Sequence, residues 1–357
     1  MTSQSSSKDG ALPSPADPRA SRTAEPSVLR DGYALAESIS RRDHNNLYLT
    51  SRFFRDPRRY EAFCAFYAVM RIVDDRVDEV VVEAGPGSAE RAAVAAEVEA
   101  WRAAVRGAYL AGPAGPAGFG SIDPRARLLI PAFRDARGRF PVPLGLWESF
   151  FAAMRRDLAV DGFATFDDFL RYTEGASVAP TTVYLILLSA QPADGAAPAA
   201  EGPFALPRGV DVFGCGRELG RFAYLVHILR DLPRDLATGA GGLWYLADED
   251  LAAFDVSRED LRTDLQEGRA RASVRRLLAA IGGRARRSLA ASERLMASIV
   301  PGLTPDCGYV LRLIVNIYRE LLERLEAVEF DPFGGAHLLT ARDKERIAAQ
   351  TAREGGY

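Results

Sequence analysis

The stretch from Tyr60 to Asp78 places chemically useful side chains at intervals of three and four positions. At helical spacing such residues share one face, so an arginine and two carboxylates follow an apolar run on the same line. Two carboxylates four positions apart repel each other, and burying them is costly unless they are paired or bind a metal. Magnesium commonly binds one or two carboxylates together with substrate phosphates. The members of this stripe are Tyr60, Cys64, Tyr67, Arg71, Asp74 and Asp78.

We therefore predict that Asp74 and Asp78, the first aspartate motif, hold Mg²⁺. For this stripe alone, an ordinary ion pair of Arg71 with Asp74 or Asp75 on a solvated helix face is an open alternative.

A second stripe of the same kind follows much later in the chain. Tyr224, His227, Asp231 and Asp235 are spaced by three, four and four positions, and two arginines stand beside them. Arginines next to carboxylates suit a diphosphate ligand, because their planar guanidinium groups bind phosphate oxygens in pairs. We call His227, Arg230, Asp231, Arg234 and Asp235 the second motif. The two motifs together predict one cavity lined from opposite sides.

Long helices must carry these stripes, and helical periodicity dominates the sequence. Asp56 and Pro57 predict a helix start, and the run Gly85-Pro86-Gly87 predicts its end after about Val82. Pro233 is expected to kink or end the helix of the second motif, which leaves the direction of Asp235 open. Further helices are predicted near 89–109, 143–159, 166–190, 209–235, 258–266, 269–299, 304–328 and 340–353, with a capping box at 165–168.

Composition sets the remaining limits. The net charge of −3 over 357 residues shows no basic excess, so no nucleic-acid partner is expected. The three cysteines are scattered, which argues against a disulfide scaffold and fits a reducing cytoplasm. Residues 1–27 are interpreted as a disordered tail and residues 28–354 as a single all-α domain, a helical bundle around a central cavity. The uncharged stretch 175–193 is interpreted as a buried core helix, and membrane association as peripheral at most.

Three segments in this order resemble the squalene/phytoene synthase family, the head-to-head type of trans-isoprenyl diphosphate synthase. Residues 65–79 read AFYAVMRIVDDRVDE, residues 225–235 read LVHILRDLPRD and residues 244–251 read WYLADEDL. The resemblance runs from about Tyr33 to Arg353 and identifies the chain as a divergent, bacterial-type member. Residues 155–158, 169–175 and 317–322 resemble the intervening and late motifs of the family.

The resemblance implies a role for each matching residue. Magnesium would be held by Asp74 and Asp78 from one wall and by Asp231, Asp235 and His227 from the other. The diphosphate would be bound by Arg71, Arg230, Arg234 and Asn45. The reacting carbon would lie near Tyr67, Tyr172 and Tyr318. For His227, Tyr172 and Tyr318 the competing interpretation is a purely structural place in the core. For Asp157, a role in the site and a surface ion pair with a neighbouring arginine are equally open.

Departures from the family pattern concentrate in the second motif and near the N-terminus. His227 stands where the family usually has Asn, Pro233 and Arg234 replace a Gly-Glu pair, and Leu47 stands where a serine would donate to phosphate. The resemblance favours Mg²⁺-dependent joining of two allylic prenyl diphosphates. The altered second motif favours an alternative, the prenylation of an aromatic acceptor of indole or carbazole type. A non-catalytic helical scaffold is the third hypothesis, and the intact Asp74 and Asp78 oppose it.

Overall fold

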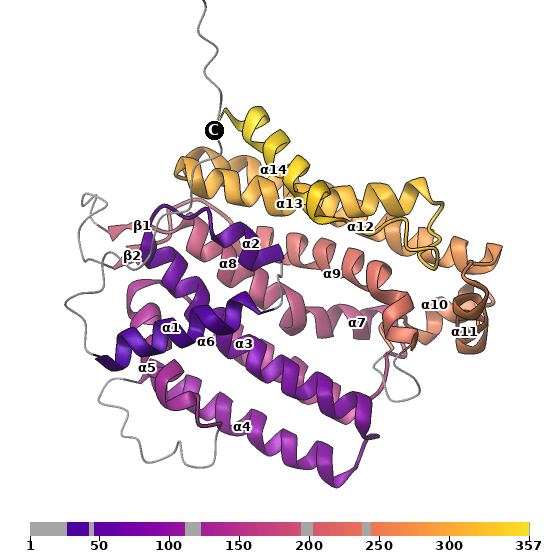
Figure 1. Ribbon diagram of the computed structural model, residues 1–357, viewed down its shortest axis with the longest axis horizontal. Coiled ribbons are helices and arrows are strands. Elements are labelled where there is room, and N and C mark those ends of the chain that lie inside the picture. The colour runs from indigo at the N-terminus through magenta and orange to yellow at the C-terminus, as the bar shows by residue number, and fades with distance from the viewer. Residues whose placement is uncertain (1–26, 43–45, 111–122, 194–202, 238–243, 357) are drawn as a thin grey trace, which may run out of the picture.

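The structure, a computed structural model, describes residues 27–42, 46–110, 123–193, 203–237 and 244–356. Long helices lie side by side around a common core (Figure 1), and the two short strands, β1 (Gln191–Pro192) and β2 (Phe204–Ala205), pair antiparallel. The prediction of an all-α fold is confirmed. The helices are α1 (Ser27–Arg41), α2 (Asn46–Ser51), α3 (Pro57–Glu83), α4 (Ala89–Tyr109), α5 (Ala126–Arg139), α6 (Leu144–Ala159), α7 (Phe166–Thr173), α8 (Ala179–Ser189), α9 (Val212–Ala237), α10 (Asp248–Ala253), α11 (Arg258–Glu267), α12 (Ala272–Ile299), α13 (Pro305–Ala327) and α14 (Ala341–Gly355).

Helix α3, which carries the first motif, begins and ends where the sequence predicts. The Asp56 side chain accepts a hydrogen bond from the backbone N–H of Arg58 at 3.0 Å, and Pro57 occupies the first helical position. These features satisfy an otherwise unpaired donor and preset the first helical φ angle. The helix is buried along most of its length and contacts α1, α5, α6 and α8.

Three helices that contact α3 were not predicted: α1, α2 and α5. Helix α1 begins next to the Ser- and Pro-rich tail, and α5 contains Pro131 in its interior. A proline removes one backbone hydrogen bond and normally interrupts a helix. In α5 the burial of Leu129, Ile130 and Phe133 against neighbouring helices compensates for that loss.

The predicted helix 166–190 is interrupted. Its first turn has the predicted capping box, in which Thr165 and Asp168 bond each other's backbone N–H groups. The helix then widens into a π-helical turn at Glu174–Val178 before α8 continues. π-helical turns often occur at functional sites, because the extra residue redirects the side chains around it.

Close backbone contacts fix this π-helical turn between α6 and α9. A Cβ atom on Gly175 would lie 2.0 Å from the carbonyl oxygen of Ser149 on α6. A Cβ on Gly220 of α9 would lie 2.7 Å from the Cα of Val178. Only glycine permits these approaches, so the two positions set how closely α6 and α9 pack on the turn.

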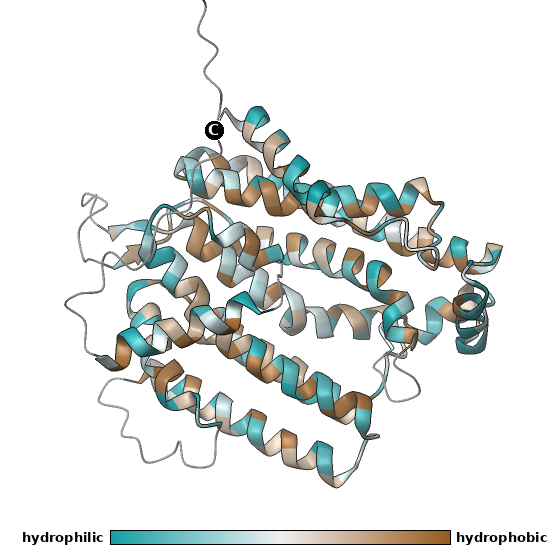
Figure 2. Ribbon diagram, in the orientation of Figure 1, coloured by the Kyte–Doolittle hydropathy of each residue, from teal (hydrophilic) through white to brown (hydrophobic). Residues whose placement is uncertain are grey.

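Burial follows the expected pattern for a helical core. Most of α8 is buried, which confirms the interpretation of the uncharged stretch as a core helix, whereas α11 on the periphery is largely hydrophilic (Figure 2). In the part of the chain that the structure describes, none of the helices combines the length and the apolar character that crossing a membrane requires. The tail at 1–26 lies outside the described residues, and the bounds of the single domain stay a prediction.

Gly175→Ala is expected to lower the free energy of unfolding by about 1–3 kcal/mol, the range for overpacking a dense core. The reason is the clash with the Ser149 carbonyl, which belongs to the α6 backbone and cannot rotate away. Gly138→Ala in α5 is the matched control, because a Cβ there meets nothing within 4 Å. That variant should change stability by about 1 kcal/mol or less, in the favourable direction. Equal effects in urea unfolding would contradict this account of the packing.

Candidate active site

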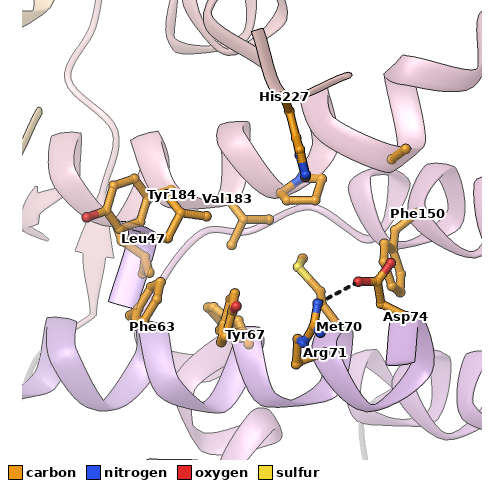
Figure 3. Close-up of a pocket in the computed structure, with 14 residues that line it drawn as sticks. Leu47, Phe63, Tyr67, Met70, Arg71, Asp74, Phe150, Val183, Tyr184 and His227 are labelled. Atoms are coloured by element: carbon orange, nitrogen blue, oxygen red, sulfur yellow. Dashed lines mark hydrogen bonds and ion pairs between the residues drawn. The ribbon is translucent and has the colours of Figure 1, made fainter. Parts of the chain in front are cut away.

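A largely apolar cavity of about 170 Å³ lies between α3, α8 and α9, and Figure 3 shows its lining. Phe63, Tyr67, Val183 and Tyr184 line one part of it, while Arg71, Asp74 and His227 lie toward the other. Its full lining is Leu47, Phe63, Phe66, Tyr67, Met70, Arg71, Asp74, Phe150, Ala176, Pro180, Val183, Tyr184, Leu187 and His227. The cavity thus has an apolar body and a polar end, as expected for a ligand with an apolar tail and a charged head.

The polar end on α3 carries an excess of negative charge. Arg71 donates to Asp74 Oδ2 at 3.0 Å and also pairs with Asp75, so one arginine serves two carboxylates. Partial desolvation and repulsion from Asp74 raise the pKa of Asp78 to about 8, although the residue retains access to solvent. The Arg71–Asp74 ion pair of the alternative interpretation is therefore present. It lies in the wall of a cavity, however, and leaves the negative charge of Asp78 poorly compensated.

The second motif, on α9, has the opposite balance. Asp231 accepts two hydrogen bonds from the Arg230 guanidinium at 2.6 and 2.7 Å, one from Arg234 at 3.0 Å and one from His227 Nε2 at 2.7 Å. Although burial opposes the shift, the bonds from Arg230 and His227 lower the pKa of Asp231. This carboxylate is held as an anion among three cationic or polar donors, so its oxygens are already engaged.

Helix α9 does not end at Pro233. It continues to Ala237, so of the two predicted outcomes, a kink or an end at Pro233, the second is wrong. Pro233 has no N–H to donate to the preceding turn, but Leu229, Leu232 and Leu236 on either side of it are buried and hold the segment in place. Nε2 of the buried His337 also contacts the Arg230 carbonyl oxygen, at 3.1 Å.

On the continued helix Asp235 pairs with Arg234 at 3.3 Å. After burial and the charges of Asp74 and Asp75, the charge of Asp235 makes a smaller contribution to the raised pKa of Asp78. Burial likewise raises the pKa of Asp235 itself. Asp235 is thus partly compensated by Arg234, whereas Asp231 is bonded by two arginines and His227.

Tyr172 lies in a buried cluster with Asp157 rather than among the residues that line the cavity described above. Its hydroxyl donates to Asp157 Oδ2 at 3.0 Å and accepts from the hydroxyl of Tyr224 at 3.2 Å. Asp157 is only 5% exposed, so the interpretation of this residue as a surface ion-pair partner is wrong. Its burial depends on α7, which folds Tyr172 over α6.

Tyr318 from α13 lies beside the second motif. Burial raises the pKa of its hydroxyl, and Arg230 and Asp231 are the charged groups that act on it. Of the predicted site residues, Tyr67, Arg71, Asp74 and His227 line the cavity, and Asn45 lies outside the described residues. His227 is half exposed and bonded to Asp231, so the interpretation of it as a core histidine is not supported.

The donor set at α3 fits a divalent cation. Burial opposes the negative charge of Asp78 and Asp235, and repulsion from Asp74 adds to the effect at Asp78, so a cation beside these carboxylates would be stabilising. Mg²⁺ needs few protein ligands when phosphates supply the rest. Within the described residues no three His, Cys, Asp or Glu side chains already converge as a metal centre. Asp231 fits a cation less well, because four hydrogen bonds already occupy its oxygens.

Sequence reasoning missed the contributions of His337 and Tyr245. Tyr245 stacks edge-on against Tyr224 at 5.8 Å between ring centroids, and it lies in a segment that follows the second motif. The signal that could have identified Tyr245 was its position in the segment WYLADEDL, which resembles a family motif. Nothing in the sequence near His337 indicated a contact with α9, because that contact spans more than a hundred positions.

The chain is similar in sequence to known proteins over most of its length. The family model described as squalene/phytoene synthase matches residues 40–347. The chain is 25% identical to a phytoene synthase from Arthrospira platensis, over 86% of this chain and 88% of that protein. It is 26% identical to a 15-cis-phytoene synthase from Synechococcus elongatus, over 85% and 87% respectively.

Solved structures show the same fold. A dehydrosqualene synthase in complex with a ligand superposes with a TM-score of 0.66 at 20% identity, covering 92% of this chain and 98% of that one. The squalene synthase HpnC from Alicyclobacillus acidocaldarius gives a TM-score of 0.64 at 20% identity, with coverage of 86% and 98%.

Asp78→Asn should alter the pH dependence of stability in the absence of divalent metal. The folded protein holds the Asp78 proton up to about pH 8, whereas an unfolded chain releases it near about pH 4. The resulting stabilisation is present at about pH 4 and is lost as the pH rises toward about 8. The asparagine side chain does not titrate, so the variant does not lose stability in this way. Its melting temperature should therefore rise relative to that of the wild type as the pH increases from about 4 to about 8.

The same substitution at the neighbouring exposed Glu79, Glu79→Gln, controls for the general loss of a negative charge. A difference between Asp78→Asn and wild type that stays constant with pH would show that Asp78 titrates like an ordinary surface carboxylate.

Proposed function

The chain belongs to the squalene/phytoene synthase family and is a prenyltransferase, and from this premise we propose that it ionises an allylic prenyl diphosphate with Mg²⁺ in the cavity between α3 and α9. The observation that carries the proposal is the division of charge at the polar end. Carboxylates predominate on α3, and arginines predominate around Asp231 on α9. A diphosphate with a bound divalent cation has the two kinds of charge that would satisfy both walls.

The residues at the polar end would bind and orient the diphosphate. Asp74 and Asp78 would hold Mg²⁺, which when bound neutralises the charge that develops on the leaving diphosphate. Arg71, Arg230 and Arg234 would bind phosphate oxygens, because guanidinium groups form paired, charge-assisted bonds with them. Each of these arginines already bonds a carboxylate, so binding requires only a partial exchange of partners.

The apolar body of the cavity would hold the prenyl chain and protect the cation. Tyr67 stacks on Phe63 at 5.3 Å between ring centroids, and Phe63 also contacts Tyr184 edge-on. Aromatic faces stabilise a desolvated cation by about 2 kcal/mol or more. The surrounding apolar side chains exclude the water that would otherwise capture it.

Two acceptors are consistent with this site. Relatives that are named phytoene synthase support the joining of two prenyl diphosphates. Two observations favour transfer from one donor to an aromatic acceptor instead: the engaged Asp231, and a cavity of about 170 Å³. An engineered cavity of about 150 Å³ in another protein binds benzene, so this volume suits a short prenyl group or a single ring. Membership in an enzyme family leaves the scaffold hypothesis without support.

The test is incubation with dimethylallyl, geranyl, farnesyl and geranylgeranyl diphosphates, each alone and with indole or carbazole, in the presence of Mg²⁺. We expect release of inorganic diphosphate that stops when the metal is chelated. Mass analysis then separates a dimer of two prenyl units from a prenylated ring. No diphosphate release from any of the four donors would overturn the proposed function.

Asp74→Ala should reduce turnover more than Asp235→Ala, with a loss of about 100-fold or more for the first. Asp74 lines the cavity on an uninterrupted helix, whereas Arg234 beside Asp235 can itself pair with phosphate. Turnover is measured at several Mg²⁺ concentrations, with Glu79→Ala on the exposed side of α3 as the control. Equal losses and equal rises in the Mg²⁺ requirement would mean that both motifs bind metal alike, and would restore the two-donor reaction as the better proposal.

A further inference from the structure

A line of hydroxyl groups connects α9 to a buried carboxyl group on α6. The Tyr224 hydroxyl donates to the Tyr172 hydroxyl at 3.2 Å, and the Tyr172 hydroxyl donates to Asp157 Oδ2 at 3.0 Å. The line begins near the cavity, because the Tyr224 ring lies 5.9 Å from the ring of His227, which lines it. It ends at Asp157, which is close enough to the first motif for Asp74 and Asp78 to influence its charge.

Asp157 differs from the other buried aspartates of the described residues. Asp250 accepts two hydrogen bonds from Arg284 at 2.6 Å each, and Asp264 accepts from the side chain and backbone of Arg271 at 2.7 and 2.8 Å. The structure shows no such ion pair for Asp157, and its Oδ1 has no hydrogen-bond partner there. A carboxyl group buried without a cationic partner is costly, so a role beyond stability is expected.

The arginine next to Asp157 in the chain does not serve as that partner. Arg156 donates to the Gly162 carbonyl oxygen at 2.9 Å and lies over the Phe163 ring, 3.9 Å from its centroid. Burial raises the pKa of Asp157 well above that of an ordinary aspartate, although the bond from Tyr172 opposes the shift. A carboxylate in such a place takes up a proton more readily than one in water.

The proposed function requires a proton acceptor whichever acceptor molecule is used. When the prenyl carbon bonds to its acceptor, the positive charge moves to the acceptor carbon skeleton. The charge is discharged when a neighbouring C–H bond breaks, and its electron pair forms a double bond or restores an aromatic ring. Water in the cavity would instead capture the cation, so the proton must leave to a group that is not bulk solvent.

We propose that Asp157 is the terminal proton acceptor of the transfer reaction and receives the proton through Tyr224 and Tyr172; this inference rests on the proposed function. The substrate proton bonds to the Tyr224 hydroxyl oxygen as the hydroxyl proton of Tyr224 passes to Tyr172. The hydroxyl proton of Tyr172 passes to Asp157 Oδ2 in turn. Both tyrosines end neutral, Asp157 ends as a carboxylic acid, and it later returns its proton to solvent.

Asp157→Asn tests the proposal with little change of shape, because the amide oxygen can still accept the Tyr172 hydrogen bond but cannot take up a proton. The reaction uses whichever of the four allylic diphosphates, alone or with indole or carbazole, the wild type converts. Inorganic diphosphate and organic products are quantified in parallel. We expect the variant to keep releasing diphosphate while coupled product per diphosphate falls about 100-fold, the range for loss of a general base. Alcohols formed by capture with water should take its place.

Tyr172→Phe should shift the products in the same way, and it carries the test if Asp157→Asn does not fold. Tyr33→Phe is the matched control, because Tyr33 is a buried tyrosine whose hydroxyl also donates to a carboxylate, Asp135 Oδ2 at 2.6 Å, outside the cavity. Its product ratio should equal that of the wild type. The melting temperature of Asp157→Asn should match or exceed that of the wild type, because a buried carboxyl group without an ion pair is removed.

Two results would overturn the inference alone. An unchanged ratio of coupled product to diphosphate in Asp157→Asn would mean that the leaving diphosphate takes the proton. A parallel fall of diphosphate release and product, with a lowered melting temperature, would mean that Asp157 is structural. Absence of diphosphate release by the wild type would instead overturn the proposed function and the inference with it.

Discussion

The repulsion between carboxylates on one face of α3 is the constraint on which the site depends. Asp74 and Asp78 lie one helical turn apart with Asp75 between them, and Arg71 supplies the nearby positive charge. The raised pKa of Asp78 shows that this compensation is incomplete. On the opposite wall the cationic groups are more numerous, because Arg230, Arg234 and His227 surround Asp231 and Arg234 also pairs with Asp235. We therefore propose that the ligand brings a cation to α3 and an anion to α9.

The fold maintains this arrangement through close contacts between helix backbones. Gly175 and Gly220 bring the backbone of the π-helical turn against the backbones of α6 and α9. His337 bonds the α9 backbone near Pro233, where the regular hydrogen-bond pattern is interrupted. Helix α7, which leads into the π-helical turn, brings Tyr172 over α6, where its hydroxyl bonds the buried Asp157.

Sequence reasoning located most of the helices and the first motif because those features are local. The start of α3 follows from Asp56 and Pro57, and the stripe of Arg71 and Asp74 follows from helical spacing alone. The continuation of α9 past Pro233 was not predictable in this way, since it depends on leucines packed against distant helices. Asp157 was undecided for the same reason, because its burial comes from residues that no periodic pattern connects to it. Where the fold brings distant segments together, local spacing carries little information about the result.

The central claim is that the cation belongs to α3 and the diphosphate to the arginines of α9. The most direct measurement is a crystal structure with Mn²⁺ and inorganic diphosphate, in which anomalous scattering locates the metal. This account predicts manganese bonded to Asp74 and Asp78, with Arg230 and Arg234 on the phosphate oxygens and Asp231 still bonded to Arg230. Manganese coordinated by Asp231, with Arg230 and His227 displaced from it, would contradict the account.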